Sequence, residues 1–130
     1  MPGPGGRSEE SSPTTIPSIG HSMGAMAVPI APDKLDAWKA WTKELTGARK
    51  AEFDASNARH QITSHHAWLQ TNPDGSHLAI AVHQGPGADT YMMSLMQSED
   101  PFDQWFAATV ADVHGMDMTA PPPPMPEQFL

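Results

Sequence analysis

The sequence of 130 residues contains no cysteine, which excludes a disulfide framework and any metal site that uses thiolate ligands. It also lacks an apolar run near the roughly 20 residues that a bilayer-spanning helix requires. No apolar segment follows Arg7 at the N-terminus, so nothing there resembles a secretory signal. We therefore predict a cytoplasmic protein with no membrane partner.

Positive charge is also scarce. Seven basic residues stand against 15 acidic ones, which gives a formal net charge of −8. A nucleic-acid partner is not expected, because binding phosphates requires a field of Lys and Arg that this chain lacks. The GxGxxG, Walker A and HExxH signatures of nucleotide and metal sites do not occur. We therefore predict that the protein uses no cofactor.

The two ends of the sequence are rich in Pro, Gly and Ser and have no periodic apolar pattern. Such segments bury too little surface to offset the entropy that they would lose on ordering. We predict a disordered leader at residues 1–19, one α+β barrel domain at 20–119 and a proline-rich tail at 120–130. The domain, at roughly 100 residues, is large enough for one sheet and a few helices but not for two cores.

The first part of the domain is expected to form a strand and two helices. Apolar residues alternate in the segment 23–30, which is typical of a strand with one buried face. Asp33 fits the N-cap of a helix that follows. A second, mostly polar helix is expected at 48–60, with Phe53 as its main apolar anchor. The first helix has apolar residues at three- and four-residue steps on one face: Leu35, Trp38, Trp41 and Leu45.

The strongest local signal is a β-hairpin. Two strand-like runs, 65–71 and 77–84, flank the turn sequence NPDG at 72–75. Its Pro and Asp fit the central positions of a type I turn, and Gly75 fits the left-handed residue of a bulge. This turn predicts the register of the two strands: Asn72 opposite Ser76, Trp68 opposite Ile80, His66 opposite Val82 and His65 opposite His83.

Two further helices are expected after the hairpin, and a short closing strand at 116–119 could complete the sheet. The second of these helices has Asp100 as N-cap, Pro101 at the favoured first position and Gly115 as its C-terminal stop. Its apolar stripe comprises Phe102, Trp105, Phe106, Val110 and Val113. The first is rich in methionine and is expected to begin at Asp89, with an inner face of Met92, Met93 and Met96.

This order of elements predicts an α+β fold of the ferredoxin-like kind, in which an antiparallel sheet carries helices on one face. Such an arrangement leaves the other face of the sheet uncovered, and a second copy of the chain would cover it. We therefore predict a homodimer.

Three segments carry a resemblance to a known family: AMAVPI running into PDKLDAWKAW, the hairpin AWLQTNPDGSHLAIAV, and the helix DPFDQWFAATVADVHG. Over residues 23–118 the chain resembles the dimeric α+β barrel superfamily, which includes antibiotic-biosynthesis monooxygenases and small polyketide cyclases. The resemblance implies a dimeric barrel with a cavity between the sheet and the helices. It also implies that this cavity holds a small, largely apolar molecule.

Histidines are the candidate catalytic residues. In the predicted register His65 and His83 share one face above small alanines, and imidazoles with pKa values near working pH suit acid/base catalysis. A register shift of one residue would separate them, and both also fit an ordinary role at a strand end or dimer interface. His114 is the third candidate, although its place at a helix C-terminus explains it equally well. His60 and His66 lie nearby, but the spacing does not suit a zinc site, so no metal is predicted.

Aromatic and methionine side chains are the candidate lining of a substrate pocket, because they are adaptable and polarizable. The same side chains also suit a hydrophobic core. Arg59 is a candidate partner for a substrate carboxylate, but it also fits a solvated ion pair on a polar helix. The predicted substrate-binding residues are Trp41, Arg59, His66, Trp68, Gln70, Met92, Met96 and Trp105.

These observations favour a cofactor-independent enzyme that acts on a small, mostly apolar secondary metabolite. A cyclase, isomerase or lyase would use histidine to move protons while the pocket orients the substrate. A close alternative is a cofactor-free monooxygenase, in which the pocket stabilises a substrate carbanion that reacts with O₂. The competing class is a non-catalytic accessory protein that binds a small molecule.

Overall fold

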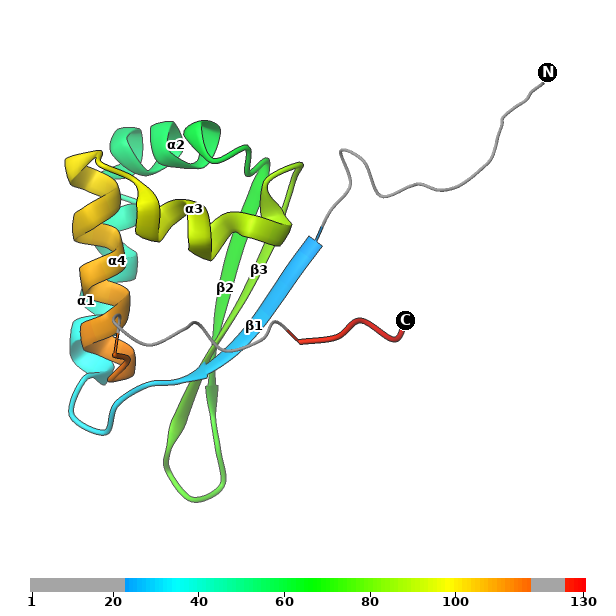
Figure 1. The fold of residues 1–130 in the computed structure, drawn as a ribbon. Coiled ribbons are helices and arrows are strands. Elements are labelled where there is room, and N and C mark those ends of the chain that lie inside the picture. The colour runs from blue at the N-terminus through cyan, green and yellow to red at the C-terminus, as the bar shows by residue number, and fades with distance from the viewer. Residues whose placement is uncertain (1–22, 118–125) are drawn as a thin grey trace.

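The computed structural model describes residues 23–117 and 126–130. Between residues 23 and 117 the chain forms a three-stranded antiparallel sheet with all of its α-helices on one side (Figure 1). The α+β class and the placement of the helices agree with the sequence prediction. In chain order the elements are β1 (Met23–Pro29), α1 (Leu35–Leu45), α2 (Lys50–Arg59), β2 (Ser64–Thr71), β3 (His77–Gln84), the 3₁₀ turn η1 (Ala88–Thr90), α3 (Tyr91–Gln97) and α4 (Pro101–His114).

The strand order is β1-β3-β2, and β3 pairs antiparallel with both neighbours. This order is compatible with a ferredoxin-like fold. Pro29 ends β1, an edge strand, where its missing N–H costs no ladder bond. The short closing strand expected at 116–119 is not formed at Met116 and Asp117, and the rest of that segment lies outside the described residues.

The hairpin has the predicted register. The N–H of Asn72 donates to the carbonyl of Ser76 at 2.8 Å, and Gly75 adopts φ +88°. His65 therefore pairs with His83, as the turn sequence predicted. Side chains alternate between the two faces of a strand, so this pair lies on the face toward the helices. Trp68 lies on the opposite face and is 54% exposed.

Helix α4 also begins and ends as predicted. The carboxylate of Asp100 accepts hydrogen bonds from the N–H groups of Phe102 and Asp103, and Pro101 occupies the first turn. Gly115 adopts φ +62°, the left-handed conformation that commonly terminates a helix. Its apolar stripe packs onto the core, where the Phe106 ring lies 4.9 Å from that of Trp41 on α1.

Three local predictions for α1 and α3 were wrong. Helix α1 begins at Leu35 with Lys34 as N-cap, one residue after the predicted Asp33. Helix α3 begins only at Tyr91, because η1 occupies Ala88–Thr90 and shifts the helical phase. Its buried residues are consequently Tyr91 and Leu95, while Met93, expected inside, is 49% exposed.

The core lies between the helices and one face of the sheet. It is formed by aromatic and aliphatic side chains from β3, from every helix except α2, and from Ile30 and Ile62 in the loops after β1 and α2. Phe53 of α2 packs against it. Across the described part of the chain, no helix covers the other sheet face, where Met23 is 47% exposed. None of the helices in that part has the length and hydrophobicity required to cross a bilayer.

Candidate functional site

A cavity of about 280 Å³ lies between the sheet and the helices. Alanines 67, 79 and 81 form much of its floor, and side chains from α1, α2, α3 and α4 form its walls. For scale, an apolar protein cavity of roughly 150 Å³ admits benzene. Among the described residues, no Lys, Arg, Asp or Glu side chain lines the cavity, and its polar side-chain groups are hydroxyls, imidazoles and indole N–H groups.

His65 and His83 lie at one end of this cavity. Their ring centroids are 4.5 Å apart and the rings meet edge to face at 78°. The Tyr91 ring lies 4.7 Å from His83 and 5.6 Å from His65, and the Phe53 ring lies 5.1 Å from His65. The pair is therefore enclosed by aromatic side chains from α2 and α3.

The hydrogen-bond partner of His65 defines its tautomer. Its Nδ1 lies 3.0 Å from the carboxamide oxygen of Asn57, which can only accept, so Nδ1 carries the proton. The Nε2 atom of His65 is then a free lone pair. By contrast, the Nδ1 atom of His83 is buried without a hydrogen-bond partner among the described residues, as is Nε1 of Trp41. Buried polar atoms are rarely left unpaired, so these two atoms mark positions suited to polar groups of a ligand.

Burial keeps both histidines neutral at pH 7. Desolvation lowers the pKa of His83 to about 4. Desolvation, followed by repulsion from His83 and His66, lowers the pKa of His65 to about 3. A neutral imidazole donates through one nitrogen and accepts through the other, so the pair offers both functions without carrying charge.

His114 lines the same cavity at its other end. Its Nδ1–H donates to the carbonyl of Pro29 at 2.8 Å. Burial lowers its pKa, although that hydrogen bond acts in the opposite direction. Pro29 pairs with Leu78, which lies five residues from His83 along β3, or roughly 16 Å of strand. His114 is therefore placed to contact a different part of a ligand from the His65–His83 pair.

Three of the eight predicted binding residues reach the cavity and five do not. Trp41 and Met92 line the cavity. His66 borders it, but the ring of His66 lies 6.0 Å from that of Trp68, on the helix-free face of the sheet. Five predicted residues are not among those that line it: Arg59, Trp68, Gln70, Met96 and Trp105.

Three of these five side chains have other partners. Gln70 donates to the Asn72 side chain at 2.9 Å. The guanidinium of Arg49 lies over the Trp105 ring, 4.1 Å from its centroid. The guanidinium of Arg59 pairs with two carboxylates, Asp103 at 2.8 Å and Asp100 at 3.2 Å. Arg59 is thus neutralised within the protein.

Two residues beside the histidine pair are not predictable from local sequence patterns. Asn57 orients His65 from α2, a contact that no local pattern signals, and Tyr91 covers the pair because α3 starts later than expected.

The sequence also contains GHSMG at residues 20–24, a match to GxSxG. That motif needs a turn that leads from a strand into a helix, whereas Gly24 here already belongs to strand β1. Among the described residues, no group of three His, Asp or Glu side chains is arranged to hold a metal.

We expect the free energy of unfolding to decrease as the pH falls from 6.5, the usual pKa of histidine, toward 4. In this window the unfolded chain binds a proton that buried His83 resists, so stability present above pH 6.5 is lost. The loss from His83 alone is on the order of 3 kcal/mol. Urea unfolding at several pH values would measure it. His83→Leu should flatten the profile, whereas His77→Leu, beside the turn, should not; equal slopes in wild type and His83→Leu would contradict the assignment.

Comparison of the sequence with models of known protein families gives no match, and comparison with curated proteins gives none either. The structure itself shows a small mixed α+β fold with an open, three-stranded antiparallel sheet and four α-helices. Membership of the dimeric α+β barrel superfamily stays a prediction that rests on the sequence resemblance.

Proposed function

We propose that the cavity binds a small, uncharged, mostly apolar metabolite and that His65 and His83 move protons on it without a cofactor. The observation that carries this proposal is a pair of neutral imidazoles, 4.5 Å apart, in a cavity that no Lys, Arg, Asp or Glu from the described part of the chain lines. A charged ligand would lose its hydration there without gaining a counter-charge, which is costly. An uncharged ligand pays no such penalty.

The lowered pKa values of His65 and His83 limit the reactions that the pair can catalyse. A base whose conjugate acid has a pKa of about 3 or 4 is weak, so it can remove only a proton that the substrate itself activates, as a carbonyl does for its neighbouring C–H bonds. The conjugate acid is correspondingly strong and readily protonates an enolate oxygen. The pair therefore suits a proton shift between two positions of one substrate, as in an isomerisation, a cyclisation or an elimination. The free lone pair of His65 Nε2 supplies the accepting position.

Two alternatives use the same cavity. In a cofactor-free monooxygenase, the substrate carbanion formed by the histidines would react with O₂, and oxygen consumption would reveal it. In a non-catalytic binding protein, the unpaired Nε1 of Trp41 and Nδ1 of His83 would only hydrogen-bond the ligand. A co-purified ligand recovered unchanged after long incubation would favour the binding protein.

The first test concerns ligand charge. 2-Naphthol and 2-naphthoate share a ring system and differ in charge at pH 7, so we expect naphthol to bind at least tenfold more tightly, a difference of about 1.4 kcal/mol. Calorimetry would measure both dissociation constants. Ala81→Leu, which fills the cavity floor, should weaken naphthol binding. Equal affinity for the two ligands, or unchanged binding in Ala81→Leu, would count against an uncharged ligand in this cavity.

The second test concerns proton transfer. 2-Tetralone is an uncharged bicyclic ketone with acidic C–H bonds, and NMR can follow its exchange of hydrogen for solvent deuterium. We expect wild type to catalyse this exchange, and His65→Ala or His83→Ala to reduce the rate by about 10²- to 10⁴-fold, the usual contribution of a general acid or base. His77→Ala should have no effect. Naphthol binding without catalysed exchange would instead support the binding-protein alternative.

We also propose that the chain forms a homodimer through the helix-free face of its sheet, as in the dimeric barrel that it resembles. Exposed Trp68 and Met23 support this interface, because a two-fold axis would bring the same apolar face of each copy together. Light scattering should give the mass of a dimer at micromolar concentration. Trp68→Glu should shift it to a monomer, while Met93→Glu on α3, at a similarly exposed position, should not. A wild-type monomer would overturn the proposal.

A further inference from the structure

Helix α3 separates the cavity from a second group of polar side chains. Tyr91 and Met92 line the cavity, whereas the other side of the helix faces an open depression on the surface. The polar residues of this depression come from the end of α2 and from α3 and its flanks: Arg59, His60, Thr90, Ser94, Gln97 and Ser98. None of them takes part in the function proposed above.

Behind the depression lies the carboxylate of Asp103, which is completely buried. Burial alone would raise its pKa, but hydrogen bonds from Arg59, Ser56, Ser98 and His60 together hold the pKa below its usual value. The hydroxyl of Ser98 donates at 2.6 Å and the guanidinium of Arg59 at 2.8 Å. Asp103 is therefore ionised and can only accept hydrogen bonds.

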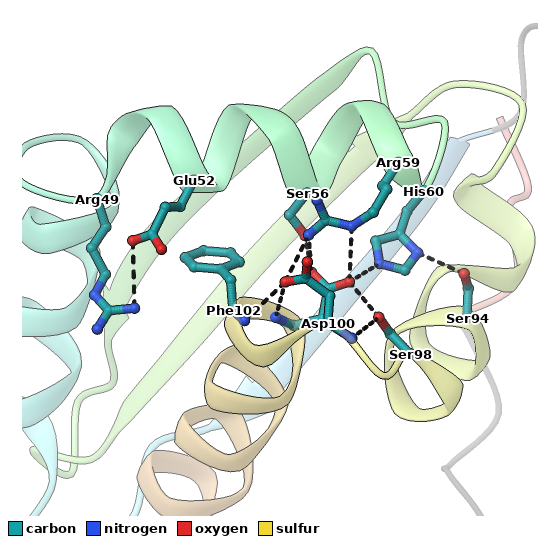
Figure 2. Close-up of polar contacts among 10 residues, drawn as sticks. Arg49, Glu52, Ser56, Arg59, His60, Ser94, Ser98, Asp100 and Phe102 are labelled. Carbon is teal, nitrogen blue, oxygen red and sulfur yellow. Dashed lines mark hydrogen bonds and ion pairs between the residues drawn. The ribbon is translucent and has the colours of Figure 1, made fainter.

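The negative charge of Asp103 determines that the ring nitrogen of His60 beside it carries a proton. The Nε2 atom of His60 lies 2.8 Å from a carboxylate oxygen of Asp103, so Nε2 carries the proton and donates it. The Nδ1 atom of His60 lies 2.6 Å from the hydroxyl of Ser94, and in the tautomer with its only proton on Nε2 it accepts from that hydroxyl. In that tautomer Ser94 donates its proton to His60, a contact drawn in Figure 2, and His60 donates to Asp103. The order serine, histidine, carboxylate is that of an activated serine nucleophile, although the two ring nitrogens are exchanged, with Nδ1 toward the serine and Nε2 toward the carboxylate.

We propose that Ser94, His60 and Asp103 form a catalytic triad that hydrolyses small esters in the depression on the outer side of α3. The Ser94 oxygen bonds to the acyl carbon while its proton passes to His60 Nδ1. The bond from that carbon to the leaving oxygen then breaks, and His60 returns the proton to the departing alcohol. Water attacks the acyl–serine in the same way, which releases a carboxylic acid and restores the Ser94 hydroxyl.

One side chain in the depression is suited to stabilise the oxyanion of these steps. Gln97 lies three residues after Ser94, on the same face of α3, and its carboxamide provides N–H donors. Asp103 keeps its negative charge throughout, so it orients His60 and stabilises the imidazolium that forms during the reaction.

Covalent labelling tests the nucleophile directly. A fluorophosphonate probe reacts with activated serines, and we expect it to label the full-length protein once, at Ser94, as located by peptide mass spectrometry. Ser94→Ala should abolish labelling, whereas Ser64→Ala, on β2 outside the depression, should leave it unchanged. No labelling, or labelling at another serine such as Ser22 of the GxSxG match, would overturn the triad.

Hydrolysis of p-nitrophenyl acetate separates a catalytic role from a structural one. Ser94→Ala removes one hydroxyl from a half-buried position and should leave the melting temperature nearly unchanged while the rate falls at least tenfold. His60→Gln retains the serine but removes its base, so both hydrolysis and labelling should fall by about 10²- to 10⁴-fold. If Ser94→Ala hydrolyses the ester as fast as wild type, the hydrogen-bond chain is structural only and the proposal is wrong.

Discussion

The buried charge of Asp103 is the constraint on which the helical layer depends. A carboxylate with no solvent contact is tolerated only when donors surround it, and here they come from α2, from its C-terminal His60 and from the segment between α3 and α4. Removing a donor to such a group costs roughly 3–5 kcal/mol, because the remaining charge stays buried and unpaired. The three helices are therefore held in one relative position by a single side chain.

This position determines what each side of α3 can do. Because the Asp103 cluster holds α3 against α2 and α4, Tyr91 is packed over His65 and His83 on the inner side. The same anchoring brings Ser94 to His60 on the outer side. A change at Asp103 would thus disturb the cavity and the depression together, although neither Tyr91 nor the histidine pair contacts its carboxylate through a hydrogen bond that the structure shows.

Local chemistry explains which features could be predicted from sequence. The NPDG turn determines the hairpin register within a few residues, and this alone places His65 opposite His83. The Asp100 cap and Gly115 define α4 in the same local way. The Asp103 cluster joins that carboxylate to Ser56, Arg59 and His60, which lie 43 to 47 positions earlier, so no turn or helical repeat signals these contacts. Arg59 was consequently assigned to a substrate, and the phase of α3 was missed because a 3₁₀ turn precedes it.

The environments of the histidines differ in one respect that decides their chemistry. Within residues 23–117, no carboxylate pairs with His65 or His83, so burial is the leading influence on the pKa of both and removes their charge. Such a pair is suited to the proton relay that we propose, but a positive charge that forms on it has no carboxylate to stabilise it. His60 has an ionised carboxylate on one nitrogen and a hydroxyl on the other, so a positive charge formed there during a reaction would be stabilised at once. Histidine is therefore suited to two different roles in this protein: the proton relay that we propose for His65 and His83 in the cavity, and the activation of Ser94 that we propose for His60 on the other side of α3.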